Sequence, residues 1–384
     1  MMPLVNRVQS LLPEIRERAI SIEEARQIPK DIIDRLVEIG FMRAMVPAER
    51  GGAEEEWIDW VQSVRLLASA DMATGWVAGL LSCHPHGVTF FDKRVQDEVW
   101  STGPDTIVAT SAAPVGRSIR VDGGVRLSGR YPFSSGCDHG NWTILGFILE
   151  QSDSREAGPY YCLVPRNEYR IEDDWFTSGL RGTGSKSVVV DDIFVPEHRW
   201  FGPGIERGPM HPGLYRNPMF ASAYFAVYNA PFAAIALGGA EGALAVATSD
   251  LHRRKGAFNG KRAAESASRQ INLGEAALEL RGAAALIEKN WRYMSDYFHE
   301  GRCQTDEEIR WWRADDVYAS NLARHAVDLL VNDAGGSMQY SHRAQQRFWR
   351  DIHTACEHPW LDTLISTQNI GQLCLGEPLT PLLG

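Results

Sequence analysis

Two changes of hydrophobic pattern divide this 384-residue chain into three parts, and their order constrains the fold more than any single motif does. Apolar residues recur at helical spacing up to about residue 103, and alternating apolar segments follow from about residue 104. Helical periodicity returns near residue 216, in long segments at 219–250, 262–299, 306–334 and 339–376. We therefore expect an α+β fold, with an N-terminal helical domain (1–103), a central β-barrel-like domain (104–215) and a C-terminal four-helix bundle (216–384).

The charge and composition of the chain narrow the class of protein. The formal net charge of −10 disfavours a nucleic-acid or anionic-membrane surface, and the apolar runs are shorter than the roughly 20 residues that span a bilayer. The N-terminus lacks the basic and then apolar pattern of a signal peptide. The six cysteines are scattered without a CxxC pair, so we expect a reducing cytoplasm and neither a metal site nor a disulfide framework.

A turn rich in glycine and hydroxyl residues precedes an apolar strand at residues 179–197. Gly182, Thr183, Gly184 and Ser185 stand in the turn, and the strand stops at Pro196. Such a turn lets the backbone come close to a flat ring, while N–H groups and hydroxyls meet the polar edge of that ring. Taken alone, the pattern fits an ordinary hairpin equally well.

The turn and the order of helices, strands and long helices resemble the acyl-CoA dehydrogenase fold. From about Ile28 to Leu375 the chain resembles the oxygenase component of two-component flavin-dependent monooxygenases, such as the 4-hydroxyphenylacetate 3-hydroxylase, steroid phenol hydroxylase and dibenzothiophene monooxygenase types. The resemblance implies that a separate NAD(P)H:flavin reductase supplies reduced flavin, as FMNH2 or FADH2. It further implies that O2 forms a C4a-hydroperoxide, that a small phenolic or indolic substrate is hydroxylated, and that the enzyme is a cytoplasmic homotetramer.

A second motif, at residues 129–142, matches the flavin-contacting segment of that family. Phe133 and Ser135 stand where family members have an aromatic residue and a hydroxyl residue against the flavin, with Ser134 between them. The hydroxyl of Ser135 can hydrogen-bond the N5 edge of the ring, and Phe133 can cover a ring face. The simpler alternative is a strand end followed by a Ser-Ser-Gly turn.

A third motif, at residues 350–358, carries a candidate catalytic histidine. In the dehydrogenase branch the corresponding Arg-Asp segment leads to a Tyr-Glu-Gly stretch whose Glu is the catalytic base, and that stretch is missing here. The monooxygenase pattern instead places His358 at this position, where an imidazole can deprotonate a phenol or hydrogen-bond a flavin peroxide. The alternatives are a histidine packed between helices, or a register in which Glu357 faces the flavin.

His84 is the second candidate catalytic histidine. It lies in Ser82-Cys83-His84-Pro85-His86, after an apolar helix, where related monooxygenases have a histidine near the flavin C4a. His84 matches that position better than His86 does. The alternative is a histidine at a helix end without a catalytic role.

Two further segments resemble the elements that hold the cofactor tail. Arg254 lies in a basic segment whose family counterpart binds a flavin phosphate, and a guanidinium suits a phosphate better than the neighbouring Lys255 does. Asn332, Gly335 and Gly336 resemble a segment that meets the cofactor across a subunit interface. A solvated basic helix face and a simple helix break are the structural alternatives.

The sequence leaves three functions open. A flavin-dependent monooxygenase is the leading interpretation, and the absence of a GxGxxG fingerprint agrees with NAD(P)H being used by another protein. The alternatives are an acyl-CoA dehydrogenase-like flavoenzyme that oxidises a thioester, and a non-catalytic member of the fold. The substrate, the choice between FMN and FAD, and C- versus N- or S-oxygenation stay open.

Overall fold

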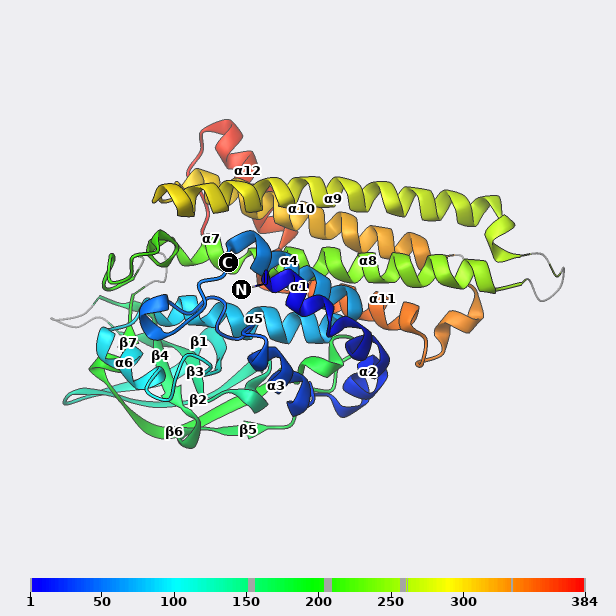
Figure 1. Ribbon diagram of the computed structural model, residues 1–384. Helices are drawn as coiled ribbons and strands as arrows, with labels where there is room; N and C mark the ends of the chain where they lie inside the picture. Colours follow the sequence, from blue (N-terminus) through cyan, green and yellow to red (C-terminus); the bar gives the residue numbers. More distant parts are fainter. Residues whose placement is uncertain are drawn as a thin grey trace.

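A computed structural model describes residues 2–150, 156–203, 209–255, 260, 262–332 and 334–382. Figure 1 shows a β-sheet at one end of the molecule, helices of the N-terminal part beside it, and long C-terminal helices along the other side. Helix α5 lies between the sheet and the long helix α8, and contacts both. The order of helices, strands and helices confirms the predicted α+β architecture.

The N-terminal part is helical, and its helices are α1 (Leu4–Gln9), α2 (Leu12–Ala25), α3 (Lys30–Glu38), α4 (Trp57–Ala70), α5 (Met72–Val88) and α6 (Lys93–Val99). Every residue of α5 is buried, which explains why its sequence is apolar on all sides. Asp71 caps this helix, because its Oδ2 accepts hydrogen bonds from the backbone N–H of Thr74 at 2.9 Å and from its hydroxyl at 2.8 Å.

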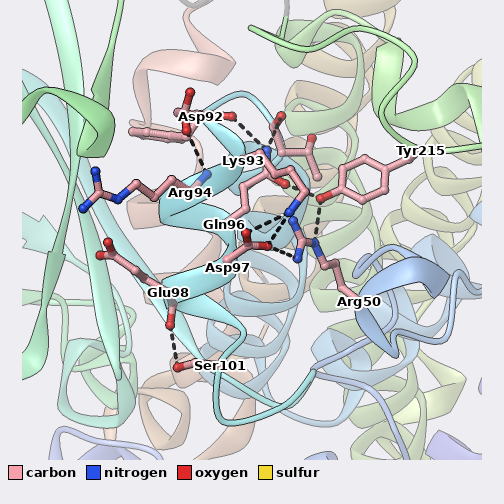
Figure 2. Close-up of polar contacts among 11 residues, drawn as sticks. Arg50, Asp92, Lys93, Arg94, Gln96, Asp97, Glu98, Ser101 and Tyr215 are labelled. Atoms are coloured by element: carbon pink, nitrogen blue, oxygen red, sulfur yellow. Dashed lines mark hydrogen bonds and ion pairs between the residues drawn. The ribbon is translucent and has the colours of Figure 1, made fainter.

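Helix α6 anchors the segment that leads from the sheet to the C-terminal helices (Figure 2). Arg50 pairs with Asp97 and donates from Nε to the Tyr215 hydroxyl at 3.1 Å. That hydroxyl donates to Gln96 on α6. The network fixes this connecting segment on the N-terminal helices.

The strands are β1 (Val108–Val121), β2 (Gly124–Ser134), β3 (Trp142–Leu149), β4 (Gly158–Pro165), β5 (Arg170–Glu172), β6 (Lys186–Pro196) and β7 (Trp200–Phe201). They form one mixed sheet in the order β5-β6-β2-β1-β3-β4-β7, in which β1 and β3 are parallel and the other pairs antiparallel. Among the described strands the hydrogen bonds do not return from β7 to β5, so the barrel-like domain is an open sheet. Gly123, at φ 75°, makes the predicted turn between β1 and β2.

The C-terminal helices are α7 (Tyr224–Tyr228), α8 (Ala230–Arg253), α9 (Ala267–Glu300), α10 (Asp306–Asn332), α11 (Ala344–Ala355) and α12 (Thr363–Leu375). Helices α8, α9 and α10 pack along one another, and α11 and α12 pack against them (Figure 1). The stretch Ala226–Arg253 is long and apolar enough to cross a membrane, but 78% of its most apolar window is buried, as in a core helix.

The helix predicted at 339–376 is wrong in one respect, because the chain leaves the helix between α11 and α12. Pro359 has no N–H to donate, and it disfavours the helical conformation of the residue before it. His358 accordingly has extended dihedral angles, φ −69° and ψ 138°. The break places the His358 side chain at the end of α11 rather than on the face of a continuous helix.

Candidate active site

Trp76 is the point at which the three parts of the chain meet. From α5 its Nε1 donates a hydrogen bond to Ser135 Oγ, just after β2, over 3.0 Å. The same indole meets the His358 imidazole edge-on, with ring centroids 5.6 Å apart, and the ring of Phe232 on α8 at 5.3 Å. Helix α5, the end of β2 and the break after α11 therefore share one site.

A chain of hydroxyl groups continues from Ser135 into the predicted turn. Ser135 Oγ lies 2.8 Å from Ser185 Oγ, which lies 2.7 Å from Thr183 Oγ1. Thr183 Oγ1 donates to the carbonyl of Leu180 at 2.8 Å. With that end fixed, each hydroxyl donates to the next, in the order Trp76, Ser135, Ser185, Thr183, Leu180. The structure thus brings Ser135, Thr183 and Ser185 together, as a flavin-edge site requires.

Phe133 and Ser134 have environments unusual for the end of a strand. Phe133 has φ 63°, a left-handed conformation that is strained for a bulky residue, and its side chain is 70% exposed. Its ring stands edge-on to Trp175 at 6.0 Å. Ser134 Oγ is buried and has no hydrogen-bond partner among the residues described by the structure. An exposed phenylalanine ring and a half-buried tryptophan beside hydroxyl groups suit a flat polar ring.

His358, and not Glu357, faces this site. Its imidazole stacks on Phe232 with centroids 4.3 Å apart, whereas the Glu357 side chain is 78% exposed and pairs with Arg324 at 3.6 Å. Nδ1 of His358 accepts a hydrogen bond from the backbone N–H of Trp360 at 3.3 Å. In the neutral ring the proton is therefore on Nε2. Loss of water around the ring lowers the pKa of His358 to about 3, so the ring is neutral near pH 7.

His84 is buried, and both of its ring nitrogens are occupied. Nδ1 lies 2.6 Å from the carbonyl oxygen of Val108, so Nδ1 carries the proton, and Nε2 accepts from the Tyr228 hydroxyl at 3.1 Å. Burial lowers the pKa of His84 to about 4. The Tyr228 ring meets Phe232 at 5.7 Å and Trp360 at 5.4 Å, which links His84 to the surroundings of His358.

The predicted tail-binding residues lie together, away from Trp76. Arg254, after α8, donates from Nη1 to the carbonyl of Ala334 at 2.7 Å, and Gly335 follows with φ 72°. Asn332 ends α10 with an exposed side chain, and Gly336 is also exposed. A small cavity of about 30 Å³ adjoins them, between α8, α9 and α10. None of the residues that line this cavity is Trp76, Ser135, Thr183, Ser185 or His358.

A larger open cavity, of about 560 Å³, lies elsewhere, between α2, α4, α8 and the start of α11. Arg16, Glu241 and Phe348 are among the residues that line it, and none of the predicted site residues does so. Its size therefore does not identify the active site. The convergence of hydroxyl, imidazole and aromatic groups at Trp76 is the stronger indication.

Sequence reasoning missed four residues of this site: Trp76, Trp175, Tyr228 and Asp351. Trp76 and Tyr228 lie in apolar segments, where an aromatic residue cannot be distinguished from ordinary core. Asp351 stands in the 350–358 motif, and its carboxyl group next to Arg350 is the signal that could have singled it out. Its Oδ1 accepts a hydrogen bond from the backbone N–H of Leu180 at 2.7 Å.

Comparison with known proteins identifies the relatives of this chain. The N-terminal and C-terminal domain families of acyl-CoA dehydrogenases match residues 8–88 and 230–363. The oxygenase component of p-hydroxyphenylacetate 3-hydroxylase from Acinetobacter baumannii is 30% identical, over 99% of this chain and 90% of the relative. The oxygenase component of an FADH2-dependent resorcinol hydroxylase from Rhizobium sp. is 32% identical, over 97% and 94%. The structure of XiaF from Streptomyces sp. with FADH2 and glycerol has a TM-score of 0.91 at 27% identity, covering 99% of this chain and 98% of that one.

Proposed function

We propose that this chain, which belongs to the oxygenase components of flavin-dependent monooxygenases and has their acyl-CoA dehydrogenase fold, hydroxylates a small phenolic or indolic substrate. One observation carries the assignment of the site. Trp76 contacts both Ser135, which begins the chain of hydroxyls that leads to Thr183, and the His358 imidazole. The phenols named in two relatives support an aromatic substrate.

The residues around Ser135 fit a reduced flavin, which when bound supplies the electrons that activate O2. Ser135 Oγ accepts from Trp76 and donates to Ser185, and a hydroxyl oxygen has a second lone pair for an N–H of the ring. The buried Ser134 hydroxyl still lacks a partner among the described residues. Phe133 and Trp175 present aromatic surface beside it. We infer that Phe133, Ser134, Ser135, Thr183 and Ser185 hold the ring.

We infer that His358 acts as a hydrogen-bond donor. Its Nδ1 is held by the Trp360 N–H, and its low pKa makes it a weak base near neutrality. Nε2–H therefore donates toward the reacting oxygen. Of the two roles that the sequence allows, hydrogen bonding to a peroxide fits this geometry better than removal of a phenol proton.

We infer that His84 and Tyr228 bind the polar group of an aromatic substrate. They form a hydrogen-bonded pair among the rings of Tyr224, Phe232 and Trp360. The Tyr228 hydroxyl donates to His84 and shares a hydrogen bond with Tyr224, which leaves one lone pair to accept from a phenol or an indole N–H. The aromatic rings supply the matching apolar surface.

Rapid mixing of the anaerobic protein–reduced flavin complex with oxygen tests the proposed function. We expect a transient absorbance band of a flavin C4a-hydroperoxide and slower reoxidation than for free flavin. Reoxidation at the free-flavin rate with no intermediate would refute the proposal. Tightly held oxidised flavin that is reduced by an acyl thioester would instead support the dehydrogenase alternative, and the lack of any flavin binding would support a non-catalytic member.

Ser135→Ala should shorten the time for which bound flavin keeps its activated oxygen. The variant loses the hydroxyl that joins Trp76 to Ser185, at a cost of about 1–2 kcal/mol, which is roughly tenfold in rate. The measurement is the rate of H2O2 release without substrate. Ser21→Ala, at an exposed helix position, serves as the control. An unchanged rate in Ser135→Ala would remove Ser135 from the site.

The assembly and the partner are also proposed. The tail group of Arg254, Asn332 and Gly335 adjoins a cavity whose lining shares no residue with the Trp76 site, and we infer that this group serves the flavin of a neighbouring subunit. Exposed apolar side chains on the outer helices, such as Leu364 at 82% and Leu278 at 68%, are suited to subunit contacts. We propose a homotetramer, supplied with reduced flavin by a separate reductase, in the cytoplasm. The six free cysteines agree with a reducing compartment.

Sedimentation tests the assembly directly. We expect a closed tetramer at micromolar concentration, and an Arg254→Ala variant that keeps the tetramer but binds reduced flavin more weakly. A monomer that binds flavin with full affinity would refute the shared site.

A further inference from the structure

Leu180 joins the start of the 180–185 turn to the rest of the protein. Its backbone N–H donates to Asp351 Oδ1 at 2.7 Å. Its carbonyl accepts from Trp175 Nε1 at 3.0 Å and from Thr183 Oγ1 at 2.8 Å. Leu180 has φ 49°, a left-handed conformation that a residue with a branched side chain adopts only when its surroundings impose it.

Asp351 is the only one of these partners that comes from the helical bundle. It lies on α11, seven residues before His358, and is 3% exposed. The neighbouring Arg350 donates to the carbonyl of Ser178 and pairs with Glu23 at 2.6 Å. Two successive residues of α11 therefore bind the segment that leads into the turn. The turn carries Thr183 and Ser185, and the same helix leads to His358.

Two buried carboxyl groups, those of Asp71 and Asp351, lie near the buried guanidinium of Arg347. Arg347, one turn earlier on α11, lies 3.7 Å from the buried Asp71, which caps α5. Asp71 and Asp351 thus share the field of one buried guanidinium. Burial raises the pKa of Asp351 to about 7, with a further contribution from the charge of Asp71. The other charged groups that face this cluster are Arg350 on α11, Glu23 on α2, and Arg181 in the turn itself, 3.7 Å from Glu23.

We propose that Asp351 is a positioning residue, whose carboxylate fixes the 180–185 turn against α11 and so aligns the hydroxyl groups of the flavin site. The inference rests on the proposed function, because it concerns binding of the same reduced flavin. A charged acceptor holds an N–H more strongly than a neutral one does. The turn is therefore held more firmly when Asp351 is ionised than when it carries a proton.

Asp351→Asn separates the charge from the hydrogen bond, because the amide oxygen can still accept from the Leu180 N–H. Below pH 6 the wild type and this variant should bind reduced flavin alike. Above pH 8 the wild type should bind several-fold more tightly, so the ratio of the two dissociation constants changes through about pH 7. Any pH dependence that comes from titration of the flavin cancels in this ratio, because both proteins bind the same flavin. Asp351→Ala, which has no acceptor, should bind about tenfold more weakly at every pH.

Asp316→Asn is the matched control. Asp316 is also buried, accepts from Asn229 at 2.7 Å, and has its pKa raised to about 7 by burial. In each case the folded-state pKa lies above the ordinary value of 3.8, so the protonated group stabilises the fold at low pH and this stability is lost as pH rises through 7. Both Asn variants should therefore flatten the pH dependence of unfolding. Only Asp351→Asn should change that of flavin binding.

The outcomes distinguish this inference from the proposed function. A wild-type protein that binds no reduced flavin refutes the proposed function. A wild type that binds flavin, with Asp351→Asn giving the same dissociation constant at pH 6 and pH 8, refutes the positioning role. A change of flavin affinity in Asp316→Asn equal to that in Asp351→Asn refutes it as well, because the effect would then reflect general stability.

Discussion

His358→Ala should give a protein that still binds reduced flavin and consumes O2, but converts most of that oxygen into H2O2 instead of hydroxylated product. The imidazole of this residue contacts Trp76 edge-on, and its Nδ1 accepts a hydrogen bond from the Trp360 N–H. Its Nε2–H has no acceptor among the described residues. Loss of one well-placed donor to developing negative charge typically costs about 10²–10³-fold in rate. We therefore expect the ratio of product to H2O2 to fall by about 10²-fold, measured with a substrate that the wild type accepts.

Three variants make this result specific. His358→Gln restores an N–H donor and should recover part of the coupling. His353→Ala removes an imidazole on α11 that pairs with Asp328 at 2.8 Å outside the Trp76 site, and this variant should couple like the wild type. Glu357→Ala should also couple normally, because its side chain is exposed. Normal coupling in His358→Ala together with a loss in Glu357→Ala would show that the acidic residue has the catalytic role.

The pH dependence of coupling gives a second check on the role of His358. Because burial lowers its pKa to about 3, its charge does not change between pH 6 and pH 8. If His358 limits coupling, we therefore expect the ratio of product to H2O2 to stay constant between pH 6 and pH 8. A general base with an ordinary histidine pKa would instead give coupling that rises with a midpoint near pH 6.5.

The sequence predicts the architecture well because the fold depends on patterns that are local in the chain. The alternation in β3 and β6 and the periodicity of α9 and α10 can each be recognised in a short window. The prediction of one helix over 339–376 is wrong at Pro359, where a single residue has more effect on the backbone than the periodic pattern around it. Apolar residues continue at helical spacing past Pro359, but the missing N–H of that residue ends the helix.

The candidate site could be predicted only as separate pieces. Ser135, Ser185 and His358 can each be identified from its own motif, yet the two ends of the set, Ser135 and His358, lie 223 positions apart in the sequence. Trp76 joins them, and nothing in its apolar helix distinguishes it from the fully buried Trp60 on α4. Which aromatic residue forms the junction depends on how α5 packs against the sheet, and that is a tertiary property.

Arg254 and Gly335 show a different limit on predicting a site from the sequence. Each could be chosen from a local pattern, and the structure brings them together through the Ala334 carbonyl. The ring that they would serve lies in another subunit by our proposal. A site completed between chains cannot be read from the contacts of one chain, so these residues stay a prediction until the assembly is measured.

Gly179→Ala is expected to have the largest effect on stability and on flavin binding together. A Cβ at this position would lie 2.1 Å from the backbone oxygen of Arg350 and 2.5 Å from Thr354 Oγ1, both on α11. The backbone oxygen cannot rotate away, so either the turn or the helix has to move. Overpacking of this kind typically costs about 1–3 kcal/mol, and we expect the upper end, about 3 kcal/mol, measured by urea denaturation.

The displacement should also release the hydrogen bond between Leu180 and Asp351, because Gly179 is the adjacent residue. We therefore expect reduced flavin to bind at least about tenfold more weakly to the folded variant. Gly371→Ala is the control: this glycine lies within α12 with open space around the added Cβ, so alanine should stabilise the helix by up to about 1 kcal/mol. If Gly179→Ala binds flavin with wild-type affinity, contact with α11 does not set the position of the turn, and the role assigned to Asp351 loses its structural basis.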